Sequence, residues 1–160
     1  PLRPVTMNNG YVMRAWYDVV SFDKGAPQDA AGIRASAESL GALVNRERER
    51  GIAAERIVVA GFSQGGAMAL QLGLRWPERL AGVIALSTWL PLADTLGGEA
   101  HPANAALPVL MAHGSLDPVV PQAAGEASRD TLRAATSMRM SPILPCSRSP
   151  LRATAITTAL

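Results

Sequence analysis

The chain has 160 residues, of which 48% are hydrophobic, and this length suits one domain with a buried core. Residues 1–130 carry 11 Lys or Arg against 13 Asp or Glu, whereas residues 131–160 carry four arginines and no acid. Scattered arginines without aromatic platforms make a poor nucleic-acid site, and no apolar run approaches the roughly 18 residues of a membrane span. We therefore expect neither a nucleic-acid partner nor a membrane span, and the oligomeric state stays open.

Cys146 is the only cysteine, which excludes an internal disulfide and a cysteine-based metal site. We expect no metal and no cofactor. The chain starts at Pro1 without a charged segment followed by an apolar stretch, so no signal peptide is predicted. A lone thiol fits a reducing compartment, and we expect a cytoplasmic location.

The first part of the chain predicts a loop followed by a long helix. Residues 1–28 mix Pro, Asn, Gly and aromatic residues, with a short extended piece near Met13–Tyr17. Residues 29–50 predict a helix that ends at Gly51. Apolar side chains recur along one face of this helix at Ile33, Ala37, Leu40 and Val44.

The middle of the chain alternates predicted strands and helices. The apolar, β-branched segment 56–62 predicts a strand buried on both faces of a parallel sheet, and 81–87 and 107–114 predict two more buried strands. Segments 64–76 and 121–135 predict helices. This order indicates an α/β fold with a mostly parallel sheet.

Residues 136–160 contain no acid, glycine or aromatic residue and show neither helical nor strand periodicity. We therefore predict a domain over residues 1–135, followed by an irregular tail over residues 136–160.

The segment "GFSQGG" at 61–66 matches the pattern G-x-S-x-G between a predicted strand and a predicted helix. A nucleophilic serine needs this tight turn, and we expect a Cβ at Gly61 or Gly65 to clash there. The N-terminus of the helix favours a developing negative charge, so the N–H of Gln64 is the expected half of an oxyanion hole. Ser63 is the predicted nucleophile; the alternative is an ordinary serine in a glycine-rich turn.

A serine nucleophile needs a histidine base and a carboxylate, in the chain order serine, acid, histidine. Asp117 follows the predicted strand 107–114 in "HGSLDPVVP", at the same sheet edge as Ser63, and is the predicted acid; it could instead cap a turn. Asp94 is the weaker choice. The two histidines, His101 and His113, both precede Asp117, so neither fits the order of the base.

Four blocks resemble the phospholipase/carboxylesterase family of α/β-hydrolases, which includes acyl-protein thioesterases and bacterial carboxylesterases. The blocks are "PLRPVTMNNGYVMRAWYD", "IVVAGFSQGGAMAL", "VIALSTWLPL" and "LMAHGSLDPVVP". The resemblance implies an α/β-hydrolase fold, cofactor-free hydrolysis of esters or thioesters, and the same roles for Ser63, Gln64 and Asp117. It also implies that Trp89 and Leu90 line an acyl pocket, for which core packing is the alternative, with Val119 a weaker candidate.

The chain departs from the family pattern in two places. The family's early strands and glycine-rich His-Gly loop have no counterpart before Pro1, so we expect a domain truncated at its N-terminus. The family's histidine would follow one more strand after the helix at 121–135, where the tail begins. We hypothesise a frameshift near residues 135–137; reading the gene in its other frames, without finding a histidine-bearing continuation, would refute it.

Two functions follow from these observations. The first is a serine carboxylic-ester hydrolase that takes a small acyl ester or thioester through an acyl-enzyme on Ser63. The second is an inactive fragment or pseudoenzyme that at most binds acyl compounds or a partner, and the missing histidine favours it.

Overall fold

The structure is a computed structural model that describes residues 1–23, 25–135 and 144–145. Its regular elements alternate between short strands and helices along the chain. The strands are β1 (Leu2–Val5), β2 (Tyr11–Arg14), β3 (Val58–Phe62), β4 (Gly82–Leu86), β5 (Val109–His113) and β6 (Leu144–Pro145). The α-helices are α1 (Ala30–Glu49), α2 (Gln64–Arg75), α3 (Leu96–Glu99) and α4 (Gln122–Ala135). In the described ranges, single-turn 3-10 helices lie at Thr6–Asn8, Ala54–Arg56, Ala93–Thr95 and Pro102–Asn104.

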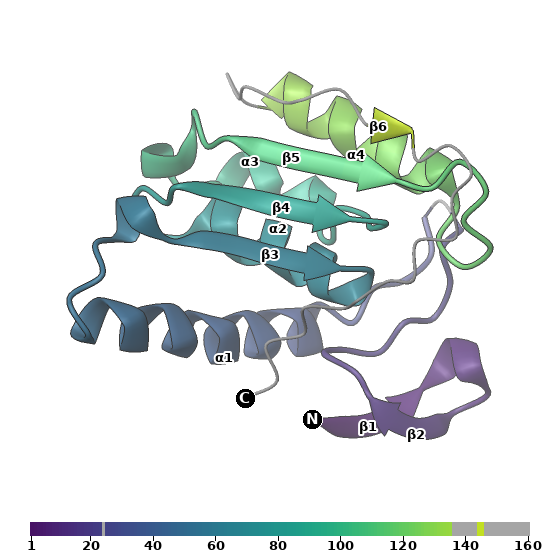
Figure 1. Cartoon of the computed structure of the whole chain (residues 1–160). Coiled ribbons are helices and arrows are strands. Elements are labelled where there is room, and N and C mark those ends of the chain that lie inside the picture. Colours follow the sequence, from purple (N-terminus) through teal and green to yellow (C-terminus); the bar gives the residue numbers. More distant parts are fainter. Residues whose placement is uncertain (24, 136–143, 146–160) are drawn as a thin grey trace.

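The main sheet is parallel, with the strand order β3-β4-β5-β6 (Figure 1). Three of its strands are those predicted at 56–62, 81–87 and 107–114, and the helices predicted at 29–50, 64–76 and 121–135 are α1, α2 and α4. The predicted parallel α/β architecture is therefore confirmed.

Helix α1 is amphipathic as its spacing predicts. Ile33 and Val44 are buried and Leu40 packs against the core. The Asp29 carboxylate caps the helix by accepting the N–H of Gly32 at 2.8 Å. The apolar stripe holds α1 against α2, which in turn packs against β3 and β4.

Burial in the sheet alternates, so the prediction of strands buried on both faces is wrong for β3. Val59, Val83 and Val109 occupy neighbouring register positions and belong to the main core. On the opposite face of β3, Val58 is 50% exposed and Phe62 is 61% exposed. In Figure 1, α2 and α3 lie behind the sheet, so the helices of the described part of the chain leave this other face open. An unbroken apolar sequence is compatible with either arrangement.

Two short pairings are absent from the sequence prediction. β1 and β2 form an antiparallel hairpin where a loop is predicted, although β2 overlaps the extended piece predicted near Met13–Tyr17. Its turn carries Asn9 at φ 55° and Gly10 at φ 72°, and an Asn-Gly pair at positive φ is a hairpin signal. β6 pairs with β5 at Ala112 and His113, so the prediction that the tail contains no strand is wrong at residues 144–145. A two-residue strand is too short to produce periodicity. Cys146 lies outside the described residues.

Candidate active site

Ser63 lies at the turn between β3 and α2, at the carboxyl edge of the sheet. Its backbone has φ 52° and ψ −123°, a conformation that is strained for any residue with a Cβ. The turn is held from three sides: the Ser63 N–H donates to the Leu86 carbonyl at 2.8 Å, and the Ser63 carbonyl accepts the Thr88 hydroxyl at 2.7 Å and the Ala67 N–H at 3.1 Å. The structure therefore has the strained strand-to-helix turn that the sequence pattern requires.

The glycines of this turn differ in what they require. A Cβ on Gly61 would lie 2.1 Å from the Gly65 carbonyl oxygen, which confirms the clash predicted there. A Cβ on Gly65 would meet only Trp16 Nε1, at 4.0 Å, so the clash predicted at Gly65 is wrong. Gly66 is the second constrained position, because a Cβ there would lie 2.9 Å from the side chain of Thr88. At the start of α2 it is therefore Gly66, and not Gly65, that faces Thr88, which follows β4.

Gln64 is the first residue of α2, so its N–H is among those that the helix leaves without an intrahelical acceptor. Its side chain reaches back to the segment before α1. The Oε1 atom accepts the Trp16 N–H at 2.8 Å, and Nε2 donates to the Tyr17 carbonyl at 2.7 Å. Nothing in the G-x-S-x-G pattern indicates these two bonds.

Asp117 follows β5 at the same edge of the sheet as Ser63. Its Oδ1 accepts the N–H groups of Val119 and Val120 at 2.9 and 3.0 Å, which is a turn cap. Burial raises the pKa of Asp117, but these two N–H groups, the Ser87 hydroxyl and the nearby His113 outweigh it and lower the pKa. Asp117 is therefore an anionic, largely buried carboxylate at the strand end.

Ser87 lies between Ser63 and Asp117 at the carboxyl edge of the sheet, and it was not predicted as a site residue from the sequence. Its N–H donates to the Ala112 carbonyl at 2.8 Å, its φ is 44°, and its hydroxyl bonds to Asp117. Thr88, the next residue, bonds to Ser63. Ser87 is the last residue of the strand predicted at 81–87 and Thr88 follows it directly, so their position at the carboxyl edge was a usable signal.

The rings of the two histidines hydrogen-bond to groups other than Ser63. His113 is buried, and its Nε2 donates to the Val120 carbonyl at 2.9 Å and lies 3.7 Å from Asp117 Oδ2, so its proton is committed to a carbonyl. These contacts give His113 a structural role at the end of β5. The His101 ring accepts the Ala103 N–H at its Nδ1 atom, at 3.2 Å, and the backbone N–H of His101 donates to the Leu74 carbonyl. Leu74 lies ten residues along α2 from Gln64, which is roughly 15 Å at the helical rise.

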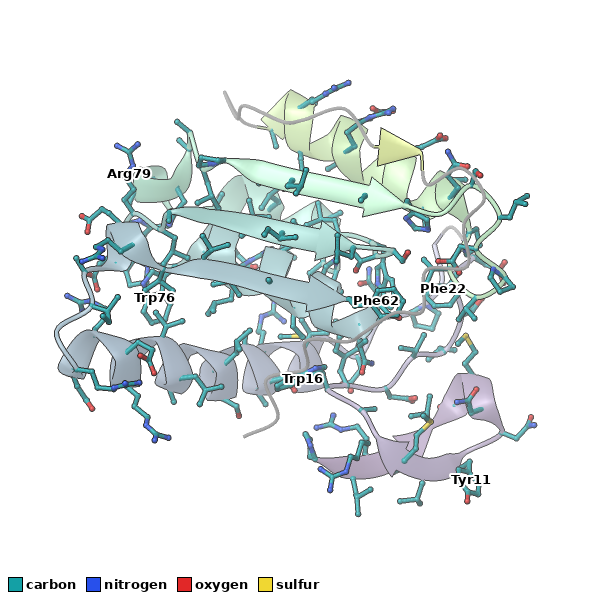
Figure 2. The ribbon with its side chains drawn as sticks, viewed as in Figure 1. Tyr11, Trp16, Phe22, Phe62, Trp76 and Arg79 are labelled. Atoms are coloured by element: carbon teal, nitrogen blue, oxygen red, sulfur yellow. The ribbon has the colours of Figure 1, made fainter. Side chains whose placement is uncertain are left out.

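The residues predicted to line an acyl pocket fall into different environments. Trp89 is partly buried and its ring packs edge-on against Tyr17 and Phe22. Leu90 is 5% exposed and packs in the main core, as the alternative for it expects. Val119 is 60% exposed. The weaker acid candidate, Asp94, is exposed in the 3-10 turn at Ala93–Thr95. In Figure 2, Phe22 and Phe62 lie near the carboxyl ends of the strands, and Trp76 lies at the opposite end.

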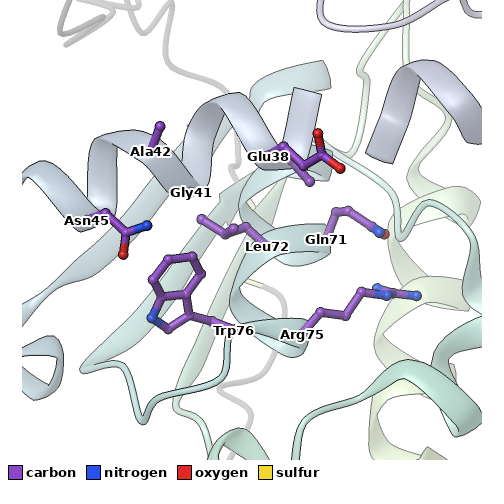
Figure 3. A pocket seen from close by; sticks show the side chains of 9 residues that line it. Glu38, Gly41, Ala42, Asn45, Gln71, Leu72, Arg75 and Trp76 are labelled. Carbon is purple, nitrogen blue, oxygen red and sulfur yellow. The ribbon is translucent and has the colours of Figure 1, made fainter. Parts of the chain in front are cut away.

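A groove of about 410 Å³ runs between α1 and α2, away from this edge (Figure 3). None of its lining residues is a predicted site residue; they are Ala37, Glu38, Gly41, Ala42, Asn45, Gln71, Leu72, Arg75 and Trp76. Within the described residues there is no group of three or more His, Cys, Asp or Glu side chains placed to hold a metal ion. No helix in that part of the chain has the length and apolarity of a membrane span.

The family model of phospholipases and carboxylesterases matches residues 1–145. The chain belongs to the phospholipase/carboxylesterase family. Among curated members it is similar to acyl-protein thioesterase 1 of Mycosarcoma maydis, with 40% identity over 142 residues, 83% of this chain and 59% of that protein. Acyl-protein thioesterase 1 of Schizosaccharomyces pombe is 41% identical over 128 residues, 80% of this chain and 57% of that protein. The chain thus spans less than two thirds of the length of these family members.

Two solved structures share the fold. Arabidopsis thaliana SOBER1 superposes with a TM-score of 0.83 at 32% identity, covering 93% of this chain and 73% of that one. Zea mays acyl-protein thioesterase 2 superposes with a TM-score of 0.74 at 31% identity, covering 94% and 74%. The expected α/β-hydrolase fold and the family resemblance are confirmed.

Proposed function

We propose that the chain carries the nucleophile and acid of a serine carboxylic-ester hydrolase, a carboxylesterase or acyl-protein thioesterase. The observation that carries the proposal is the turn at Ser63, with its φ of 52° and the enforced glycine at position 61. Membership of a family with acyl-protein thioesterases supports the substrate class, a small acyl ester or thioester. The cytoplasmic location expected from the sequence stays a prediction.

In the proposed reaction, Ser63 Oγ attacks the carbonyl carbon of the acyl group while a base takes its proton. In the family pattern this base is a histidine that follows the acid, a position that neither His101 nor His113 occupies. The oxyanion of the tetrahedral intermediate accepts the N–H of Gln64, and the alcohol or thiol leaves with the proton. Water then attacks the acyl-enzyme and releases the acid. Asp117 would orient the base, and Trp89, with Leu90 and Val119 as further candidates, would contact the acyl chain.

The second candidate is an inactive fragment, and one observation favours it: the sequence holds two histidines, and the hydrogen bonds of both rings go to groups other than Ser63. Removing the base from such a triad costs about a millionfold in turnover, with about 10³- to 10⁴-fold over water remaining from binding and the oxyanion hole. This candidate keeps the fold and the acyl surface but lacks a proton acceptor.

Labelling with a fluorophosphonate probe separates the two candidates. The proposed hydrolase expects covalent labelling that is lost in Ser63→Ala and kept in Ser39→Ala, because Ser39 is an exposed serine in α1. No labelling of the wild-type chain at high probe concentration would favour the inactive fragment. Labelling that persists in Ser63→Ala would refute Ser63 as the nucleophile.

A further inference from the structure

The segment at Trp16–Tyr17 has no regular structure, yet side chains satisfy its backbone. The Trp16 N–H donates to Gln64 Oε1, and the Trp16 carbonyl accepts the hydroxyl of Ser36, on α1. The Tyr17 carbonyl accepts Gln64 Nε2. Since Tyr17 is buried and Trp16 is half-buried, water cannot easily replace these partners. The segment is therefore fixed by two helices rather than by a strand partner.

Gln64 makes two of these three hydrogen bonds, and Ser36 makes one. The Oε1 atom of its carboxamide accepts the Trp16 N–H at 2.8 Å, and the Nε2 atom donates to the Tyr17 carbonyl at 2.7 Å. Both the acceptor and the donor of the amide are therefore used. A carboxylate, a thioether or an alkyl group cannot make both bonds. The requirement for a glutamine side chain is separate from any use of the Gln64 backbone N–H.

The fixed segment carries one side of an aromatic cluster. The Trp89 ring contacts two other rings edge-on. Its centroid lies 6.5 Å from that of Tyr17 and 4.8 Å from that of Phe22. Tyr17 also belongs to one buried cluster with Ala67 and Met68, from the first two turns of the helix that follows Ser63. We call Tyr17, Phe22 and Trp89 the aromatic wall.

We infer that the Gln64 side chain is a positioning residue that holds the aromatic wall in register with the Ser63 turn, and so sets which acyl chains the site accepts. This inference rests on the proposed function for its second half and on contacts within the chain for its first. The inference distinguishes substrates by acyl length. A long acyl chain would contact the aromatic wall, whereas an acetyl group would contact little beyond the Ser63 turn.

The test compares three variants of the full chain. Gln64→Met keeps the size and the backbone N–H but loses both bonds, and Gln64→Glu keeps an acceptor for Trp16 but loses the donor to Tyr17. Gln71→Met is the matched control, because Gln71 is a 2%-exposed glutamine in the same helix α2. Amide hydrogen exchange of residues 15–22 is measured by mass spectrometry. We expect about tenfold faster exchange in Gln64→Met, a smaller change in Gln64→Glu, and none in the control.

The second readout is the ratio of labelling rates for a decyl and an ethyl fluorophosphonate. We expect this ratio to fall about tenfold in Gln64→Met and to stay within about twofold in Gln71→Met. Unchanged exchange at residues 15–22, an unchanged ratio, or an equal effect in Gln71→Met would overturn the inference. If the wild-type chain takes no label, the proposed function fails, and the exchange measurement alone decides whether Gln64 holds the wall.

Discussion

The carbonyl oxygen of Gly65 lies where a Cβ on Gly61 would have to be, at a separation of only 2.1 Å. The reverse does not hold, because a Cβ on Gly65 has no neighbour closer than 4.0 Å. The two glycines of the G-x-S-x-G pattern thus carry different constraints. The first makes room for the backbone of the second.

This asymmetry predicts opposite outcomes for two alanine variants. Gly61→Ala forces the β3–α2 turn apart and should lower the free energy of unfolding by about 3 kcal/mol or prevent folding. Gly65→Ala adds a methyl group to a helical position and should be neutral or stabilising by up to about 1 kcal/mol. Urea unfolding followed by circular dichroism measures both. Equal destabilisation by the two changes would contradict the close approach of Gly61 to the Gly65 carbonyl.

The backbone strain at Ser63 predicts that glycine is better tolerated there than alanine. Ser63 has φ 52°, where glycine loses the Cβ penalty, so Ser63→Gly should be about 1 kcal/mol more stable than Ser63→Ala. At Ser39, in the middle of α1, the order should reverse by about 1 kcal/mol because glycine is a poor helix former. Thermal unfolding of the four variants checks the inversion, and the same order at both sites would argue against strain at Ser63.

Asp117 should stabilise the fold through its charge. Its folded pKa is lowered, so its contribution is present above the unfolded pKa of about 3.9 and is lost as the pH falls through the folded value. Asp117→Asn should therefore cost about 1 kcal/mol at pH 7, with the difference from wild type shrinking below about pH 4. Urea unfolding at pH 7 and pH 3 measures this. A difference that grows at the lower pH would have the wrong sign.

Glu99 joins three helices through ion pairs and should show a second pH dependence. Its carboxylate accepts hydrogen bonds from Arg34 on α1, from Thr95 in the 3-10 turn before α3, and from Arg75 on α2. These bonds lower the pKa of Glu99 to about 2. Stability from this group is complete above the unfolded value of about 4.5 and declines toward pH 2. Because the side chain is one third exposed, Glu99→Gln should cost no more than about 1 kcal/mol at pH 7. Urea unfolding of both proteins at pH 7 measures this, and Glu47→Gln, an exposed pair with Arg50, is the control that should have a smaller effect.

Within the described residues neither histidine ring bonds to Ser63, and this predicts chemical rescue. If only the proton acceptor is missing, added imidazole should raise the rate of nitrophenyl-ester hydrolysis by the wild-type chain above that of imidazole in buffer. Ser63→Ala should show no such excess. The measurement is initial rate against imidazole concentration at about pH 7.5, where imidazole is mostly neutral. An excess of equal size in both proteins would mean that Ser63 takes no part.

Much of the fold follows from local sequence patterns. The stripe through Ile33 and Val44 predicts α1, and the apolar segments at 56–62 and 107–114 predict β3 and β5. Exposure of Phe62 was not predictable in the same way, because the sequence of a strand does not say whether a helix covers each face. The predicted boundary at residue 135 stays a prediction, as most of the tail lies outside the described residues.

The candidate site also combines features that local sequence patterns predict with features that depend on tertiary packing. Ser63 and Asp117 follow strands and carry recognisable chemistry, so sequence alone proposes them. The need for glycine at Gly66 rather than Gly65 depends on where Thr88 lies, and the role of the Gln64 side chain depends on a segment 48 residues earlier. Such contacts are set by tertiary packing, and no spacing rule within a single element reveals them.

The bond from Gln64 back to Trp16 also bears on the order in which the molecule assembles. A contact across 48 residues forms only after a long loop has closed, so it carries an entropic penalty that the helices beside it do not. We expect α1 and α2 to form early and the Gln64 side chain to gain its two bonds late, when the N-terminal segment docks. A nascent or partly denatured chain would then possess its secondary structure before the segment at Trp16–Tyr17 is fixed beside the Ser63 turn.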